Sequence, residues 1–258
     1  MKKCRLFNLH VLLFVCSLLF IATGCAQNPK PYDIPRLPKK IKNKEYCREG
    51  YTVGYNKNRR VANFVAWHLT RERINGPASR KCSRFKEDEE LPIPRATLED
   101  YKGSGWSRGH LCPAGDNKWC QEAMDDSFFL TNICPQDESL NSGIWNQIEM
   151  KCREWADYYG DILIVTGPIF NKKIKTIGPN KVAVPDYFFK VVMSLDAHTK
   201  AIGFICPNKK IPGKMYDYVV SVDEVEKITG FDFFPSIPKE TQNRAEKMKD
   251  ISIWDPKL

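Results

Sequence analysis

Three short segments that mix polar with apolar residues follow one another in this chain, and they constrain its fold more than any other feature. They are Trp106–Asp116, Leu130–Gln136 and Leu140–Glu149. A strand or loop that carries His110, a second strand that carries Asn132 and a helix whose start carries Asn141 would enclose a single cleft. The order and spacing of these segments therefore predict a strand, strand, helix unit.

The first segment places the guanidinium of Arg108 two residues from the imidazole of His110. This pairing is suited to holding a phosphate while a base acts beside it. Outside the N-terminal leader the other histidines are His68, in an apolar strand, and His198, in a hairpin turn. We interpret both as ordinary structural or exposed residues, which leaves His110 as the candidate base for phosphodiester chemistry.

Residues 1–24 have the pattern of a signal peptide, because basic residues precede an apolar run from Leu9 to Ala22 and small residues follow. The run is shorter than the roughly 20 residues that span a bilayer. The ending Ile21–Cys25 resembles a bacterial lipoprotein signal, in which Cys25 becomes the lipidated N-terminus. We expect an exported bacterial envelope protein that is anchored through Cys25 and is periplasmic or displayed at the cell surface, with plain secretion as the alternative.

The charge favours an anionic partner. The formal net charge is +9, and removal of the three positive charges of the leader leaves +6. Such an excess suits nucleic acid and anionic lipid surfaces equally well. Residues 25–44 are rich in Pro, Lys and Asn and predict an extended tether, followed by one domain over residues 45–258.

The cysteines of an exported chain are read by default as disulfides. Seven remain after the leader and Cys25 are set aside: Cys47, Cys82, Cys112, Cys120, Cys134, Cys152 and Cys206. A zinc site is the rival interpretation, but Cys112 and Cys120 lie too far apart for the usual ligand spacing. The sequence does not give the connectivity.

Periodicity predicts an α+β fold around a largely antiparallel sheet, since strands and helices are interspersed without a regular βαβ alternation. The expected strands are Tyr51–Tyr55, Val61–Leu69, Phe128–Ile133, Asp161–Phe170, Val182–Leu195 and Ala201–Cys206. We expect a loop over Arg71–Thr97 and an amphipathic helix over Ser142–Tyr159. A capping box at Ser221–Glu224 opens a further helix that ends at Gly230.

The three segments together resemble the DNA/RNA non-specific endonuclease family, whose core is the ββα-metal nuclease fold. The matching residues are Arg-Gly-His at 108–110, Thr-Asn-Ile-Cys-Pro-Gln at 131–136, and Leu-Asn at 140–141 with Trp145 and Glu149 downstream. The resemblance extends less sharply over most of residues 45–238. It implies a metal-dependent, sequence-non-specific endonuclease that hydrolyses DNA, RNA or both.

The resemblance also implies a role for each residue. His110 would be the general base that activates water, and Arg108 would neutralise charge on the phosphate. Asn141 would be the direct ligand of a single Mg²⁺, with Mn²⁺ as a substitute. A water on the ion would protonate the departing 3′ oxygen and leave a 5′ phosphate. Asn132 would position the phosphate or the histidine, and Glu149 would hydrogen-bond the water shell of the ion.

Two of these residues raise questions. Eight helical residues separate Asn141 from Glu149, which is about 12 Å of rise and roughly 80° of rotation, so both cannot be direct ligands on an ideal helix. Either the helix starts irregularly after Asn141, which Ser142 and Gly143 permit, or Glu149 acts only through water. Ser107 stands where family members commonly carry an aspartate, so metal affinity or rate would differ.

Two other functions fit the sequence. One is a non-catalytic envelope protein that keeps the scaffold and binds nucleic acid or a partner. The other is a phosphodiesterase that acts on a lipid or a cell-wall polymer.

Overall fold

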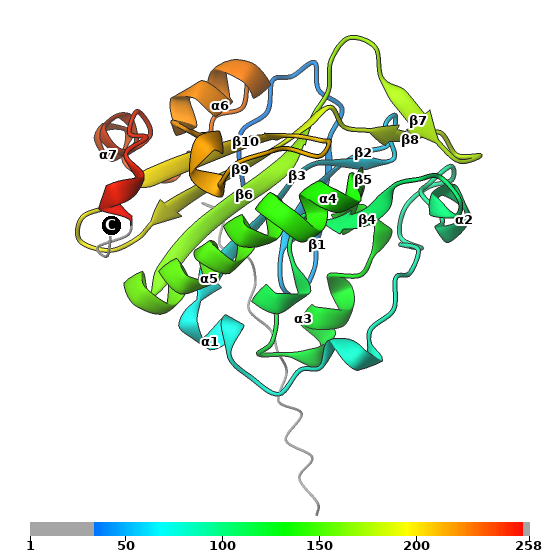
Figure 1. The fold of residues 1–258 in the computed structure, drawn as a ribbon, viewed down its shortest axis with the longest axis horizontal. Coiled ribbons are helices and arrows are strands. Elements are labelled where there is room, and N and C mark those ends of the chain that lie inside the picture. Colours follow the sequence, from blue (N-terminus) through cyan, green and yellow to red (C-terminus); the bar gives the residue numbers. More distant parts are fainter. Residues whose placement is uncertain (1–33, 255–258) are drawn as a thin grey trace, which may run out of the picture.

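The computed structural model describes residues 34–254, and within them seven strands form an antiparallel sheet in the order β1-β2-β3-β6-β9-β10-β11 (Figure 1). These strands are β1 (Lys44–Cys47), β2 (Thr52–Asn56), β3 (Val61–Thr70), β6 (Asp161–Ile169), β9 (Tyr187–Ser194), β10 (Ala201–Pro207) and β11 (Val219–Val220). Two smaller pairs are β4 (Ser107–His110) with β5 (Ile133–Gln136), and β7 (Lys175–Ile177) with β8 (Val182–Val184).

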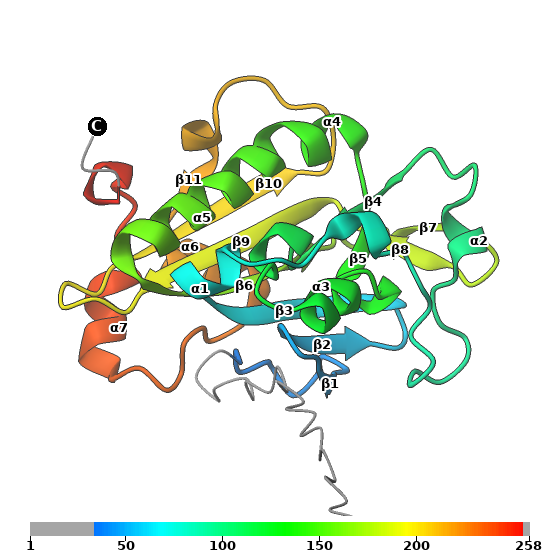
Figure 2. The ribbon, with the colours of Figure 1, turned by 90° about the horizontal axis from the view of Figure 1, so that it is seen from below.

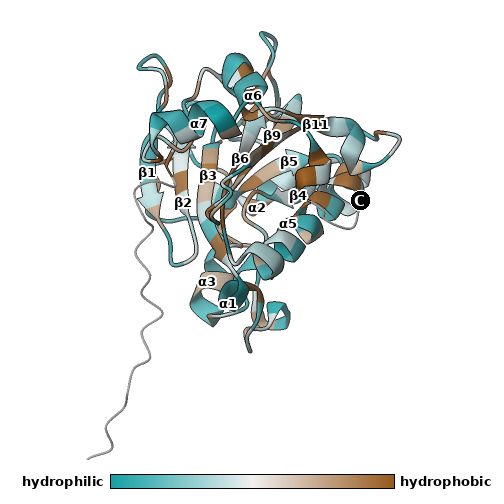
Figure 3. Ribbon diagram, turned by 90° about the vertical axis from the view of Figure 1, so that its left-hand side faces the viewer, coloured by the Kyte–Doolittle hydropathy of each residue, from teal (hydrophilic) through white to brown (hydrophobic). Residues whose placement is uncertain are grey.

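Helices cover both faces of the large sheet. The helices are α1 (Arg71–Ile74), α2 (Leu98–Tyr101), α3 (Gln121–Asp126), α4 (Glu138–Leu140), α5 (Asn146–Tyr159), α6 (Val222–Thr229) and α7 (Lys239–Ala245). Helix α5 runs along one face, on the side of β4 and β5 (Figure 2). Helices α6 and α7 cover the opposite face, and hydrophobic residues concentrate along the strands between the two layers (Figure 3).

The central strands are apolar throughout because side chains alternate between two buried faces. In β3, Val65 and Trp67 pack in the cluster that contains the α5 residues Ile148 and Trp155. Phe64 and Ala66 point to the other side and pack with residues of α6 and α7. Trp145, Ile148 and Trp155 are buried, which confirms that they belong to the core rather than to an exposed base-stacking surface.

The α+β class and the two predicted hairpins are confirmed. The first hairpin is β2–β3 and the second is β9–β10. The capping box is also confirmed: the side chain of Ser221 accepts from the N–H of Glu224, and Gly230 ends α6 with a positive φ of 74°. The long helix ends at Gly160, as its sequence predicts.

Two predicted strands are corrected. Residues 128–133 do not form a strand, because 130–132 adopt a 3₁₀ turn and β5 begins only at Ile133. The strand expected over 182–195 is split into β8 and β9 around Pro185, which lacks the N–H that a ladder needs. The expected loop 71–97 contains one short helix, α1, and a 3₁₀ turn at 80–82.

The predicted tether does not hold for residues 34–44. Arg36 forms a backbone bridge with Asp232, and Ile34, Leu37 and Ile41 pack against the α6–α7 side of the core. The ordered part of the domain therefore begins before residue 45. The predicted signal peptide and the predicted lipidation site Cys25 lie outside the described residues. No helix among residues 34–254 combines the length and apolarity needed to cross a membrane.

The expectation of a disulfide framework is wrong for six cysteines. Cys47, Cys82, Cys112, Cys134, Cys152 and Cys206 are free thiols. Four of them are buried in the core, where a free cysteine packs as a small apolar residue.

Substitution of Gly167 by Ala should destabilise the sheet. A Cβ at Gly167, in β6, would lie 2.3 Å from the carbonyl oxygen of Asn63 and 2.8 Å from the Phe189 ring. We expect the free energy of unfolding, measured by urea denaturation, to fall by about 1–3 kcal/mol. Gly203→Ala is the control, because its nearest atom lies at 3.0 Å. Equal losses in the two variants would contradict the packing described here.

Candidate active site

The candidate site is built on the antiparallel pair β4–β5. Ser107 pairs with Gln136 and His110 with Ile133, so all of the Arg-Gly-His motif lies in β4. Gly109 is required at this crossing because a Cβ there would lie 2.0 Å from Oε1 of Gln136. Helices α4 and α5 follow β5, so the predicted strand, strand, helix unit is present.

The Asn132 side chain forms hydrogen bonds that link the residues directly before β5 to those just after β4. Its Oδ1 accepts from the N–H of Cys112 at 2.8 Å, and its Nδ2 donates to the carbonyls of Cys112 at 2.8 Å and Ser127 at 2.7 Å. The residue is fully buried, and both amide protons are used within the protein. The Asn132 side chain therefore bonds to the segment that follows His110, as expected of a residue that positions the histidine.

His110 lies among aromatic rings with one nitrogen unpaired. Its ring centroid is 5.3 Å from that of Phe85 and 5.0 Å from that of Phe128. Nε2 is buried, and within residues 34–254 it has no hydrogen-bond partner. Burial, and then the positive charge of Arg80, lowers the pKa of His110 to about 3. The imidazole is therefore neutral near pH 7, as a proton acceptor must be.

A cavity of about 590 Å³ brings Arg108 and Asn141 together. Arg80, Lys102 and Arg108 give its wall a positive charge that Glu99 only partly offsets. Its other lining residues are Phe85, Leu98, Tyr101, Trp106 and Ser107. The Arg108 guanidinium lies 4.3 Å from the centre of the Phe85 ring, the same ring that contacts His110. The cavity therefore carries a net positive charge, and His110 packs against the Phe85 ring of its wall.

The start of the long helix is irregular. Asp137 caps α4 through hydrogen bonds from the N–H groups of Ser139 and Leu140. Residues 141–145 then form a π turn, within which Gly143 leaves the helical region (φ −101°, ψ −112°). This break confirms the irregular start that Ser142 and Gly143 were expected to permit, so ideal-helix geometry does not apply between Asn141 and Glu149.

Asn141 fits a magnesium ligand. Asn141 lines the cavity, and its backbone N–H donates to the carbonyl of Asp137 at 2.9 Å, so the backbone holds the residue at the cavity wall. An amide oxygen is a hard ligand of the kind that Mg²⁺ accepts together with several waters. A carboxylate lies nearby, because the hydroxyl of Ser107 donates a hydrogen bond to Glu138 in α4. Ser107 therefore carries no charge itself but contacts an acid from the adjacent helix.

Glu149 lies in the first turn of α5, within a charged cluster beneath the site. Desolvation by burial raises the pKa of its carboxyl to about 7, and the positive charges of Lys190 and Arg153 oppose this rise. Arg153 forms an ion pair of 2.9 Å with Asp116, which also accepts from the Trp67 indole at 3.1 Å. This network ties α5 to β3, and it fixes the helix that carries Glu149.

Two residues of the site were missed by sequence reasoning. Arg80 and Phe85 lie in the segment expected to be a loop, yet Arg80 acts on the charge of His110 and Phe85 contacts both His110 and Arg108. Basic residues occur at many positions between 71 and 97, so no local pattern distinguishes Arg80.

Comparison with known proteins identifies the family. The family of DNA/RNA non-specific endonucleases matches residues 28–240. Human mitochondrial nuclease EXOG is 38% identical over 216 residues, which cover 77% of this chain but only 59% of the human protein. Nuclease C1 of Cunninghamella echinulata var. echinulata is 36% identical over 211 residues, with 75% of this chain and 84% of that protein covered.

A crystal structure of the EndoG/EndoGI complex has a similar fold. It superposes with a TM-score of 0.73 at 29% sequence identity, covering 81% of this chain and 91% of that one. The family match begins at residue 28, ahead of residue 45, in agreement with the packing of residues 34–44. The chain belongs to the DNA/RNA non-specific endonuclease family, and β4, β5 and the helix that follows them are its ββα-metal unit.

Proposed function

We propose that this protein is a magnesium-dependent, sequence-non-specific endonuclease that hydrolyses DNA, RNA or both. The observation that carries the proposal is the placement of a neutral His110, with an unpaired buried Nε2, behind the basic cavity that holds Arg108 and Asn141. A phosphate backbone is the anion that this cavity suits, and backbone contacts give no direct base readout.

Arg108 and His110 have different roles in the proposed reaction. Arg108 binds a non-bridging phosphate oxygen and opposes the charge that develops there. His110 takes a proton from the attacking water at Nε2. The negative charge of the bound phosphodiester counteracts that of Arg80, which raises the pKa of His110 toward the range a general base needs.

Asn141 would hold the divalent ion, and Glu149 and Glu138 would accept from the waters around it. When bound, the ion supplies positive charge at the phosphate and at the departing 3′ oxygen. Cleavage on that side of the phosphorus leaves a 5′ phosphate. Mn²⁺, which takes similar oxygen ligands, would substitute for Mg²⁺.

Export and lipid anchoring on Cys25 remain part of the proposal on sequence grounds alone. The pattern of residues 1–25 supports them, and these residues lie outside the described part of the chain. Such a protein would act on nucleic acid in the bacterial envelope or at its surface.

Substitution of His110 by Ala should abolish cleavage of plasmid DNA in the presence of Mg²⁺, because no other group replaces the base. A loss of at least 100-fold in rate is expected. His198→Ala is the matched control, since His198 is exposed in the β9–β10 hairpin. Full activity of the His110 variant would exclude this mechanism, and inactivity of the wild-type protein on DNA and RNA alike would favour a binding protein or another phosphodiester substrate.

Substitution of Asn141 by Ala should raise the Mg²⁺ concentration needed for half-maximal cleavage by roughly tenfold or more, since a direct ligand is lost. Calorimetric titration with Mg²⁺ should show the same weakening without any substrate. Asn146→Ala, at the first position of α5, serves as the control. Unchanged Mg²⁺ affinity in the Asn141 variant would remove this residue from the metal site.

The pH dependence of kcat/KM should change when the positive charge of Arg80 is removed. Because kcat/KM follows the free enzyme, its acidic limb should lie well below the ordinary histidine value of about 6.5. Arg80→Gln removes a charge that lowers the pKa of His110, so the limb should move to higher pH. Arg84→Gln is the control, because that guanidinium donates to the carbonyls of Lys81 and Ser83. A limb that stays in place in the Arg80 variant would contradict the assignment.

A further inference from the structure

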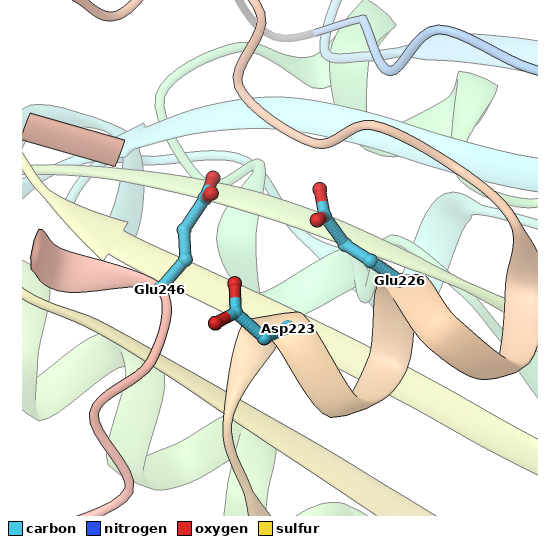
Figure 4. Close-up of side chains that lie close together, drawn as sticks. All are labelled: Asp223, Glu226 and Glu246. Carbon is cyan, nitrogen blue, oxygen red and sulfur yellow. The ribbon is translucent and has the colours of Figure 1, made fainter. Parts of the chain in front are cut away.

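Three carboxylates meet on the face of the sheet opposite α5. Asp223 and Glu226 lie one turn apart in α6, and Glu246 directly follows α7 (Figure 4). Each offers an oxygen, and the three oxygens lie within 4.8 Å of one another. This cluster belongs to the α6–α7 layer, whereas the candidate active site lies on the side of α5.

The backbone holds the cluster in place. The N–H of Asp223 donates to the carbonyl of Glu246 at 3.1 Å, and the N–H of Glu246 donates to the carbonyl of Gln242 at 2.8 Å. Oε1 of Glu226 accepts from the N–H of Phe233 at 2.8 Å, which leaves its second oxygen available. The two consecutive helices α6 and α7 are therefore fixed with their acids facing one another.

Glu246 is the unusual member. It is only 1% exposed, and its Oε1 is buried without a hydrogen-bond partner. A buried carboxylate is strongly unfavourable unless it is paired, protonated or bound to a cation. Among residues 34–254, no lysine or arginine forms an ion pair with any of the three acids, and nearby Lys239 contacts Gln242 and Asp232 instead.

We propose that Asp223, Glu226 and Glu246 bind one calcium ion that joins α6 to α7, at a site separate from the active centre. Three carboxylates are hard ligands, and oxygens that lie within 4.8 Å of one another can share one calcium ion, whose bonds to oxygen are about 2.4 Å long. Magnesium demands a strict octahedral geometry and keeps several of its waters, so a cluster of three protein carboxylates suits it less well.

The test compares thermal unfolding of the full chain with chelator and with CaCl₂ at about 100 times the Kd measured by calorimetry. Calcium should raise the Tm of the wild-type protein by roughly 5–10 °C. Glu246→Gln should lose this increment, because the neutral amide removes one of the three carboxylates that bind the ion. Glu240→Gln, an exposed acid in α7, should keep the full increment.

Two further measurements keep the result unambiguous. Calorimetry on Asn141→Ala, which lacks the active-site ligand, should still show one calcium ion bound. Asp223→Asn, at an exposed position, should weaken that affinity at least tenfold and covers the case in which Glu246→Gln fails to fold. An equal Tm increment in the wild-type and Glu246→Gln proteins, no calcium binding by Asn141→Ala, or unchanged affinity in Asp223→Asn would overturn the proposal.

Discussion

The pairing of β4 with β5 is the constraint on which the candidate site depends. It sets Arg108 and His110 on one short strand, and Asn132 locks that strand to its neighbour through the backbone of Cys112. Loss of one of these buried hydrogen bonds would lower the free energy of unfolding by about 1–3 kcal/mol, because the freed N–H or carbonyl group could not bond to water instead. The geometry of the base is thus a property of the backbone as much as of the histidine.

The helix break at Gly143 is the second requirement. In one regular helix from Asp137 onward, Asn141 and Glu149 would lie on different faces. The π turn interrupts the helix between them, so the orientation of Asn141 is not set by the periodicity of α5. The network of Asp116, Arg153 and Trp67 then holds α5 against β3. The same segment also brings Glu138 to Ser107, so an acid contacts the position at which the resemblance led us to expect an aspartate.

The sequence predicted the parts of the structure that depend on local signals. The hairpins, the capping box at Ser221 and the irregular start after Asn141 all follow from turn and cap chemistry. Burial and long-range packing decided the remainder: residues 34–44 lie on the core, and six cysteines are free thiols. Arg80 lies at the site but belongs to a loop, and loops have no periodic sequence pattern from which their course could be predicted. The hydrogen bonds from the Asn132 side chain to backbone groups are likewise seen only in the structure.

The central claim is that a neutral imidazole behind a basic cavity activates water for cleavage on the 3′ oxygen side of a phosphodiester. End-group analysis of the products tests it most directly, with DNA and RNA each digested in Mg²⁺ and in chelator. The account predicts 5′-phosphate and 3′-hydroxyl ends with Mg²⁺ and no products with chelator. Ends that carry a 3′ phosphate, or cleavage that continues with all divalent ions removed, would contradict it.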